Sequence, residues 1–315
     1  MTTPHTDIRD VRLLYGCMGL GGGWDRQRWT AADLGHAEAA VEAALEAGIT
    51  AFDHADIYRH GKSEEVFGEV LARSSGLRER ILVQTKCGIT LPDRDRVGSY
   101  DLRGGTILRR VEESLTRLRT DVIDVLLLHR PDPLARPEEI AEAFRALHRQ
   151  GTVRQFGVSN MSAAQIAFLQ MHLDVPLVVD QLEMSLARRH WVESGVLLNT
   201  PDGAAGGFPH GTVEHCVAHG IQVQAWGALA RGRFTGGADS PAARLVADLA
   251  LRKGTSPETV LLWWLRRHPA RVVPVVGTTR PERILACRDA VHRAPALSHE
   301  EWYELWVAAR GAPLP

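Results

Sequence analysis

Short apolar runs alternate with longer amphipathic segments along most of the chain. Eight of these runs have the length of a β-strand, and they lie at residues 11–16, 51–55, 81–88, 124–129, 153–159, 178–185, 221–227 and 272–277. Most of them are apolar without strict alternation, which is expected when both faces of a strand are covered. The pattern therefore predicts eight buried strands.

The segments between these runs show helical spacing and helix-capping residues. Helices are predicted at residues 30–47, 106–118, 137–150, 162–171 and 259–268. Ser162 and Ser256 stand at N-capping positions, and Pro257 follows Ser256 at the first helical position. Gly48 and Gly151 follow two of the helices, where glycine commonly ends a helix.

Strands that alternate with helices imply right-handed crossovers and a parallel sheet. Eight such repeats favour a closed barrel over an open sheet, so the predicted fold class is α/β, a (β/α)8 TIM barrel. We expect one domain over residues 1–315, with a polar tail at residues 1–10. Two long segments, 190–211 and 231–241, follow the sixth and seventh strands. On a barrel they overhang the C-terminal mouth, where long loops commonly act as lids or specificity loops.

The composition and charge indicate a globular protein and give no sign of a nucleic-acid or membrane partner. With 44% hydrophobic and 24% charged residues the chain has an ordinary globular composition. Its 37 basic and 38 acidic residues leave no excess charge to attract a nucleic acid or a membrane. Residues 1–10 lack the apolar core of a signal peptide, and no apolar run reaches the roughly 20 residues that span a bilayer. We therefore expect a cytoplasmic protein that binds neither nucleic acid nor membrane.

The cysteines point to no special chemistry. They form no C-x-x-C pair and have no histidine at zinc spacing, so reduced, buried thiols and no metal site are expected. The four are Cys17, Cys87, Cys216 and Cys287.

Four polar side chains lie at the ends of three consecutive strands, where TIM barrels hold their active sites. The second strand is followed by Asp53 and Tyr58, the third by Lys86 and the fourth by His129. A phenol has a reference pKa of about 10, but an ammonium beside it eases proton release. A carboxylate can hold that ammonium, and an imidazole can orient the oxygen that receives the proton. The combination predicts general-acid catalysis at a carbonyl, with Tyr58 as the donor.

Several neighbouring residues are expected to be structural. His54 and Cys87 each follow a predicted catalytic residue along a strand, so their side chains should point to the opposite face. Trp263 and Trp264 lie in a predicted helix and are expected to pack on the barrel wall.

The motifs that carry these residues resemble those of the aldo-keto reductases. AFDHADIY, the TK at the next strand end and LLLHRPD at the one after look like the signature of that family, as do GVSN and VVPVVGTTRPERI. The resemblance runs from about Leu14 to Ala290. The segments HRPDPLARPEEIAEAF and HWVESGVLLN look most like a bacterial branch of predicted oxidoreductases. The resemblance implies an NADPH-dependent reduction of an aldehyde or ketone, with the catalytic tetrad at Asp53, Tyr58, Lys86 and His129.

The resemblance also implies which residues bind the cofactor. Ser159, Asn160 and Gln181 would hold the nicotinamide carboxamide, and Trp226, where many members carry Tyr, would stack on the ring. The phosphate loop after the last strand would consist of Gly277, Thr278, Thr279, Arg280 and Arg283. A guanidinium at Arg283 would grip the 2′-phosphate, which favours NADPH, with NADH possible.

Two further expectations concern the loop after the first strand. Gly19 and Leu20 would pass the nicotinamide side of the cofactor, and Trp24 would line the substrate pocket. The chain departs from the family where Glu and Asn commonly contact the adenine, because Ala286 and Cys287 stand there. We therefore expect weaker binding of the adenine.

Two alternatives use the same residues differently. A nicotinamide-binding regulatory protein with little turnover would share the fold and the cofactor site. A Schiff-base aldolase would use Lys86 as a nucleophile, but the neighbouring Asp53 favours a charged lysine, whereas a Schiff-base nucleophile must be neutral. The expected partner is a small carbonyl compound.

Overall fold

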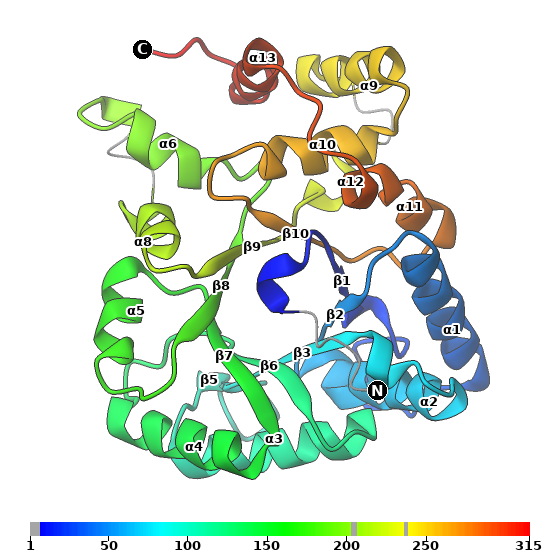
Figure 1. Cartoon of the computed structure of the whole chain (residues 1–315), viewed down its shortest axis with the longest axis vertical. Coiled ribbons are helices and arrows are strands. Elements are labelled where there is room, and N and C mark those ends of the chain that lie inside the picture. Colours follow the sequence, from blue (N-terminus) through cyan, green and yellow to red (C-terminus); the bar gives the residue numbers. More distant parts are fainter. Residues whose placement is uncertain (1–6, 203–206, 236–238) are drawn as a thin grey trace.

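A computed structural model describes residues 7–202, 207–235 and 239–315, and eight parallel strands close into a barrel in it (Figure 1). Around the barrel the order is β1-β10-β9-β8-β7-β6-β3-β2. The strands are β1 (Leu14–Gly16), β2 (Ala51–Asp53), β3 (Leu82–Cys87), β6 (Ile123–Leu128), β7 (Val153–Ser159), β8 (Leu177–Glu183), β9 (Gln222–Trp226) and β10 (Val273–Val276). Each overlaps one of the eight predicted runs, with β6 and β8 beginning one residue earlier than predicted, so the (β/α)8 fold class is confirmed.

Helices surround the barrel. They are α1 (Ala31–Glu46), α2 (Lys62–Arg73), α3 (Gly104–Leu118), α4 (Pro137–Gln150), α5 (Ala163–Gln170), α6 (His190–Val196), α8 (Thr212–Ala218), α9 (Pro241–Lys253), α10 (Pro257–Arg266), α11 (Pro281–Leu285), α12 (Arg288–His292) and α13 (His299–Arg310). The five predicted helices are confirmed, because α1, α3, α4, α5 and α10 match them. Capping explains their sharp ends: Ser162 and Ser256 each accept a backbone N–H three residues ahead, and Gly151 adopts a left-handed conformation.

Other elements lacked a clear signal in the sequence. Helix α2 begins at Lys62, and the preceding Gly61 offers no side-chain cap. Helix α6 occupies part of the segment 190–211 that was predicted as a loop, and residues 203–206 of that segment lie outside the described residues. In the segment 231–241, helix α9 begins at Pro241, and residues 236–238 lie outside the described residues.

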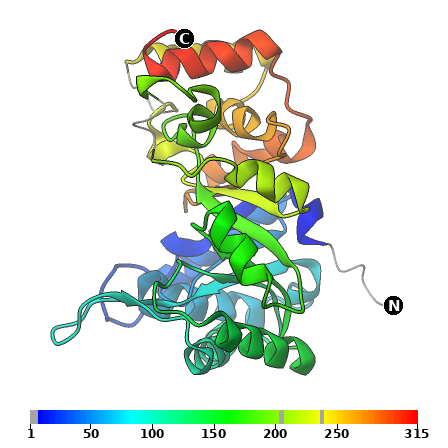
Figure 2. The ribbon, with the colours of Figure 1, turned by 90° about the vertical axis from the view of Figure 1, so that its left-hand side faces the viewer.

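A short antiparallel hairpin, β4 (Ile89–Thr90) with β5 (Ser99–Tyr100), follows β3 and was not predicted. Figure 2 shows it projecting from one side of the barrel. Because the hairpin follows a strand end, it lies on the C-terminal side of the barrel, where the candidate site is. Among the described residues, no helix is both long and apolar enough to cross a membrane.

The start of the chain closes the other end of the barrel. Residues Ile8–Asp10 form a 3-10 helix, η1, which lies within the ring of strands in Figure 1. The side chain of Ile8 is fully buried, and its carbonyl accepts a hydrogen bond from Gln222 Nε2 at 2.6 Å. The expectation of a polar tail over residues 1–10 is therefore wrong for Ile8, because the open end of a barrel needs an apolar plug. Residues 1–6 lie outside the described residues.

Apolar packing forms two separate cores. One lies between the helices and the outer wall of the barrel and includes Trp263 and Trp264, both fully buried as expected. The other fills the lower half of the barrel interior and consists of Ile8, Val11, Leu14, Ala51, Leu82, Val125, Leu127, Val178, Val179, Val273 and Val275. The upper half of the interior is polar, and this division places the candidate site at the C-terminal mouth.

Replacing Ile8 by alanine is expected to lower the free energy of unfolding by about 2–4 kcal/mol, because it removes buried methyl groups and leaves a cavity. Arg9→Ala is the matched control, because the Arg9 side chain is exposed, and it should change stability by less than about 0.5 kcal/mol. Equilibrium urea unfolding followed by circular dichroism measures both values. Equal losses in the two variants would contradict the plugging role.

Candidate active site

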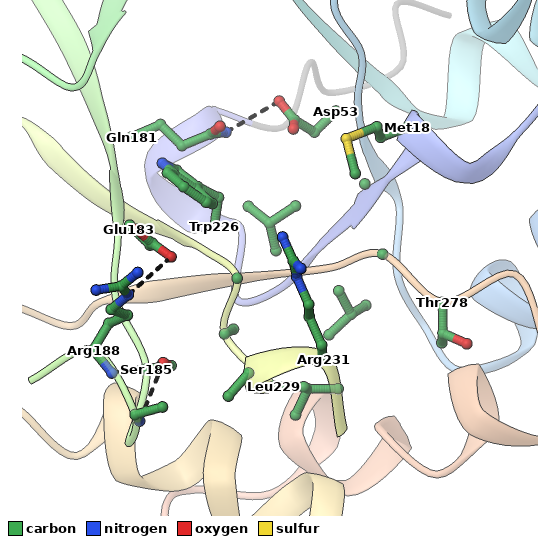
Figure 3. A pocket seen from close by; sticks show the side chains of 18 of the residues that line it. Met18, Asp53, Gln181, Glu183, Ser185, Arg188, Trp226, Leu229, Arg231 and Thr278 are labelled. Carbon is green, nitrogen blue, oxygen red and sulfur yellow. Dashed lines mark hydrogen bonds and ion pairs between the residues drawn. The ribbon is translucent and has the colours of Figure 1, made fainter. Parts of the chain in front are cut away.

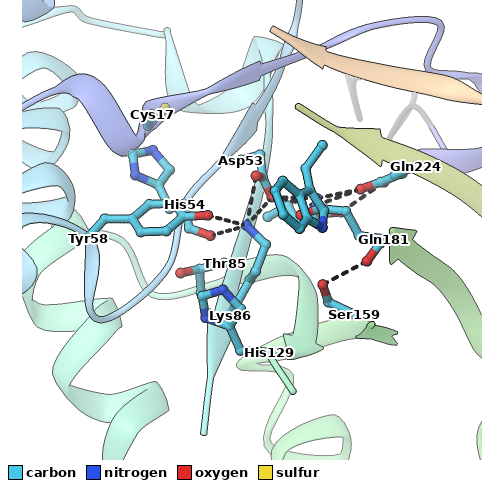
Figure 4. Close-up of polar contacts among 12 residues, drawn as sticks. Cys17, Asp53, His54, Tyr58, Thr85, Lys86, His129, Ser159, Gln181 and Gln224 are labelled. Carbon is cyan, nitrogen blue, oxygen red and sulfur yellow. Dashed lines mark hydrogen bonds and ion pairs between the residues drawn. The ribbon is translucent and has the colours of Figure 1, made fainter. Parts of the chain in front are cut away.

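The four predicted catalytic residues converge at the C-terminal mouth of the barrel (Figure 4). Asp53 ends β2, and Tyr58 begins the 3-10 helix η3 (Tyr58–Gly61) shortly after it. In the register of β2 and β3, Asp53 lies beside Gln84, so Lys86 is two residues further on the same inward face. His129 follows β6, and its backbone N–H donates to the Cys87 carbonyl at 2.9 Å.

Lys86 is the centre of the polar contacts. Its Nζ donates to both carboxylate oxygens of Asp53 at 2.7 Å, to the His54 carbonyl at 2.8 Å and to Tyr58 Oη at 3.2 Å. Lys86 and Asp53 are almost completely buried. A buried ammonium is stable only when its donors are satisfied, and here Asp53, the His54 carbonyl and Tyr58 do so.

The protonation of the pair follows from these contacts. Burial by itself would lower the pKa of Lys86, but the charge of Asp53 and the contact with Tyr58 outweigh it, so this pKa is raised. Burial raises the pKa of Tyr58, and the ammonium of Lys86 offsets only part of that effect. The expected lowering of the Tyr58 pKa by Lys86 is thus present but smaller than the effect of burial. At neutral pH the lysine is charged and the phenol keeps its proton, which disfavours the Schiff-base alternative.

His129 provides a neutral imidazole next to the phenol. The Tyr58 and His129 rings meet edge to face with centroids 6.0 Å apart. The pKa of His129 lies well below its usual value. Burial is the largest cause, and the positive charges of Lys86 and Arg130 add to it. A neutral imidazole has one N–H to donate, so His129 can orient an oxygen without carrying a charge.

A cluster of three glutamines supports Asp53 from inside the barrel. Gln84 Nε2 and Gln181 Nε2 donate to Asp53 Oδ1 at 2.6 and 3.1 Å, and both also donate to Gln224 Oε1. Gln224 Nε2 in turn donates to Gln84 Oε1 at 3.0 Å. Gln84 and Gln224 were not among the predicted site residues. Their signal was present, since each is a polar residue at an inward position of a buried strand.

His54 and Cys87 point away from the site, as expected. His54 is fully buried with its ring 4.5 Å from that of Phe67, and burial lowers its pKa to about 3. Burial also raises the pKa of the Cys87 thiol far above its usual value, so this cysteine is no nucleophile.

A cavity of about 760 Å³ opens above the four predicted catalytic residues. Its lining includes ten of the predicted site residues: Asp53, Tyr58, His129, Ser159, Asn160, Gln181, Trp226, Gly277, Thr278 and Arg283. Lys86 lies behind this lining, where it contacts Tyr58. Residues at or just after the C-terminal ends of β2, β6, β7, β8, β9 and β10 line the cavity.

Other predicted residues do not line the cavity. A side chain at Gly19 would meet Thr279 at 2.6 Å, so both residues serve the packing of the loop after β1 on the loop after β10. Leu20 is buried, and its carbonyl accepts a hydrogen bond from Ser63 Oγ at 2.8 Å. Arg280 is exposed and lies 3.6 Å from Glu282.

Trp24 contacts the two residues that follow Tyr58 and is not among the residues that line the cavity. The Arg59 guanidinium lies 5.3 Å from its ring centroid, and the His60 ring meets it edge to face at 6.1 Å. Almost half of the Trp24 surface is exposed. Its placement in the substrate pocket therefore stays a prediction.

Polar groups from β7, β8 and β9 form a connected strip along the cavity. Trp226 Nε1 donates to Asn160 Oδ1 at 3.2 Å, and Asn160 Nδ2 donates to Ser159 Oγ at 2.8 Å. Ser159 Oγ donates to the Gln181 carbonyl at 2.8 Å. Asn160 has a positive φ of 59°, a conformation that asparagine tolerates better than most residues. These bonds hold the indole of Trp226 in a defined orientation.

The loop after β9 supplies lining residues that the sequence analysis missed. Ala230 and Arg231 both have positive φ values, 48° and 55°, between Gly227 and Gly232. In Figure 3, Arg231 points into the cavity between Trp226 and Thr278. It makes no hydrogen bond or ion pair within the part of the chain that the structure describes.

Known proteins resemble this chain throughout its length. The profile of the Aldo/keto reductase family matches residues 12–306. The uncharacterized oxidoreductase YcsN of Bacillus subtilis is 38% identical over 318 residues, which cover 98% of this chain and 97% of that protein. A 6-dehydroglucose reductase of Agrobacterium fabrum is 34% identical, with 95% of this chain and 94% of that protein covered. A crystal structure of an aldo/keto reductase from Klebsiella pneumoniae with NADP and acetate has a TM-score of 0.73 at 25% identity, covering 96% and 92% of the two chains.

The buried His54 makes stability depend on pH. Its folded pKa of about 3 lies below the unfolded value of 6.5, so the unfolded chain binds a proton first as the pH falls. The free energy of unfolding should therefore fall between pH 6.5 and about 3, by at most about 1.4 kcal/mol per pH unit from this residue. Urea unfolding at several pH values should show a shallower slope for His54→Leu than for the natural chain. Identical slopes would contradict a neutral, desolvated His54.

Proposed function

This chain belongs to the aldo/keto reductase family, and from this premise we propose that it reduces an aldehyde or ketone to an alcohol with NADPH, by direct hydride transfer. Tyr58 donates the proton to the carbonyl oxygen. The observation that supports this most is the contact at 3.2 Å between Lys86 Nζ and Tyr58 Oη, on the wall of the cavity. The similarity to the 6-dehydroglucose reductase of Agrobacterium fabrum supports a reductase function as well.

Each catalytic residue has a separate task in this proposal. The bound nicotinamide cofactor supplies the hydride. Tyr58 holds a proton at Oη and transfers it to the developing alkoxide, and the ammonium of Lys86 stabilises the phenolate that remains. Asp53 keeps Lys86 charged and aimed at Tyr58. His129, as a neutral imidazole, orients the carbonyl oxygen toward Tyr58.

The cavity suits a dinucleotide. The strip formed by Ser159, Asn160 and Gln181 offers hydroxyl and amide groups for the nicotinamide carboxamide. The indole of Trp226, held by Asn160, offers a flat face for stacking on the nicotinamide ring. NADP or NADPH is present in solved relatives that cover 96% of this chain, which supports the same cofactor here.

Arginines at the other end of the cavity suit the phosphates. Arg283 and Arg231 both line the cavity. Thr278 lies near them, and neither arginine has an acidic partner within the described residues. A guanidinium binds phosphate with two parallel hydrogen bonds, so these side chains favour the additional 2′-phosphate of NADPH.

Replacing Tyr58 by phenylalanine should leave NADPH binding intact and lower kcat for carbonyl reduction about 10²- to 10⁴-fold, because only the proton donor is lost. NADPH binding is measured by fluorescence titration and turnover by NADPH oxidation. The matched control is Tyr303→Phe in α13, a partly exposed tyrosine outside the cavity, which should keep full turnover. Turnover retained in Tyr58→Phe would overturn the proton-donor role. Negligible turnover of many carbonyls by the natural protein, despite NADPH binding, would instead favour the regulatory alternative.

Replacing Arg283 by alanine should raise the KM for NADPH about 10- to 100-fold, because a hydrogen-bonded charge is worth about 1.5–3 kcal/mol. The KM for NADH should change little, since NADH lacks the 2′-phosphate. Arg280→Ala is the control, because Arg280 is exposed and does not line the cavity. Equal effects on both cofactors would show that Arg283 does not contact the 2′-phosphate.

A further inference from the structure

An arginine without a partner lies beside the reacting groups. Arg130 directly follows His129 at the end of β6, is half-buried and lines the same cavity as Tyr58 and His129. It makes no hydrogen bond and no ion pair with any residue that the structure describes. A half-buried charge without a partner is costly, and a bound anion would remove that cost.

The topology separates Arg130 from the proposed phosphate end of the cavity. In the closed order of the barrel, β6 stands four strands away from β10 in either direction, so the two strands face each other across the barrel. Thr278 and Arg283 follow β10. Arg130 therefore lies on the opposite wall from these residues and cannot share their ligand group.

No net negative charge near Tyr58 balances the positive charge of Arg130 among the described residues. Lys86 is neutralised by Asp53 at 2.7 Å. His129 is uncharged because burial, Lys86 and Arg130 all lower its pKa. Arg59, next to Tyr58 in the chain, adds a second positive charge, since among the described residues its guanidinium contacts the Trp24 ring and, through Nε at 3.1 Å, the Met18 carbonyl, with no acidic partner. The reaction end of the cavity is consequently positive overall.

The acidic residues of the cavity do not change this balance. Glu183 lies 3.4 Å from Arg188, near the end of β8, and is paired with it. Glu258 is in the first turn of α10, the helix before β10, and so belongs to the wall opposite Arg130.

We propose that the substrate is a carbonyl compound with a carboxylate or another anionic group, which Arg130 binds while the carbonyl lies against Tyr58 and His129. This proposal rests on the proposed function and adds the substrate class to it. A guanidinium matches a carboxylate with two parallel hydrogen bonds, so Arg130 would fix the orientation of the substrate as well as its affinity. Phosphate shares this chemistry, and the test below separates the two anions.

The test compares aldehydes that differ in charge. Para-carboxybenzaldehyde and its uncharged para-carbamoyl analogue form the carboxylate pair, and glyceraldehyde 3-phosphate and glyceraldehyde form the phosphate pair. The full-length enzyme is assayed with NADPH, and the quantity of interest is the ratio of kcat/KM for the anionic to the neutral aldehyde. The variants are Arg130→Gln, Arg130→Lys and, as control, Arg136→Gln, whose side chain is exposed before α4.

The natural enzyme should prefer the anionic member of at least one pair by about 10- to 100-fold. Arg130→Gln should abolish this preference and leave neutral aldehydes within about 3-fold of the natural rate, because a neutral aldehyde makes no anion contact and burial and Lys86 still hold the pKa of His129 down. Arg130→Lys should keep part of the preference, since an ammonium retains the charge and loses the planar fork. Arg136→Gln should behave as the natural enzyme. The preferred pair identifies the anion as carboxylate or phosphate.

Three results would overturn the proposal. Equal losses on anionic and neutral aldehydes in Arg130→Gln would mean that Arg130 acts only by keeping His129 neutral. A ratio near one in the natural enzyme, with neutral aldehydes readily reduced, would exclude an anion subsite and leave the proposed function intact. An absence of turnover on every aldehyde would refute the proposed function and this proposal together.

Discussion

The buried ion pair between Lys86 and Asp53 is the interaction on which the rest of the site depends. Removing two charges from water costs several kcal/mol for each, and only close geometry with further hydrogen bonds repays it. Here both carboxylate oxygens lie 2.7 Å from Nζ, and two of the three glutamines donate to Asp53. Because these partners come from β2, β3 and β8, with Gln224 of β9 bridging the glutamines, the full set of contacts around the ion pair forms only when the barrel is closed.

The interior of the barrel changes from apolar to polar along its axis. Its lower half is filled by aliphatic side chains and closed by Ile8, while its upper half holds the glutamine cluster and the ion pair. The apolar half gives stability that does not depend on the site. The polar half places a protonated phenol and a charged ammonium side by side. Their electrostatic interaction is stronger there than in water, which would screen it. This division explains why the chemistry is confined to the C-terminal mouth.

The cavity above the ion pair has positive groups at opposite walls. Arg283 and Arg231 follow β10 and β9, and Arg130 follows β6 across the barrel. Between them lies Trp226, whose orientation depends on its hydrogen bond to Asn160. A dinucleotide phosphate at one wall and an anionic carbonyl compound at the other would bring the reacting atoms together in the middle, beside Tyr58 and His129. The proposed cofactor specificity and the proposed substrate class are thus two consequences of one charge distribution.

The sequence by itself determined the eight strands, five helices and the four residues at the strand ends. These features are local, because apolar periodicity, capping serines and strand-end polar residues are properties of short segments. Family resemblance extended this to the cofactor residues. In the predicted phosphate loop, Gly277, Thr278 and Arg283 line the cavity, and Thr279 and Arg280 do not. Spacing along a loop cannot tell which side chains face inward.

Only the tertiary structure decided how distant segments meet. The glutamine cluster joins three strands, Ile8 plugs a barrel whose last strand is more than 260 residues away in the chain, and Arg231 enters the cavity through two consecutive residues with positive φ. The structure also showed that burial outweighs Lys86 in setting the pKa of Tyr58. Such outcomes depend on desolvation and closure of the whole barrel, and no local pattern in the sequence contains them.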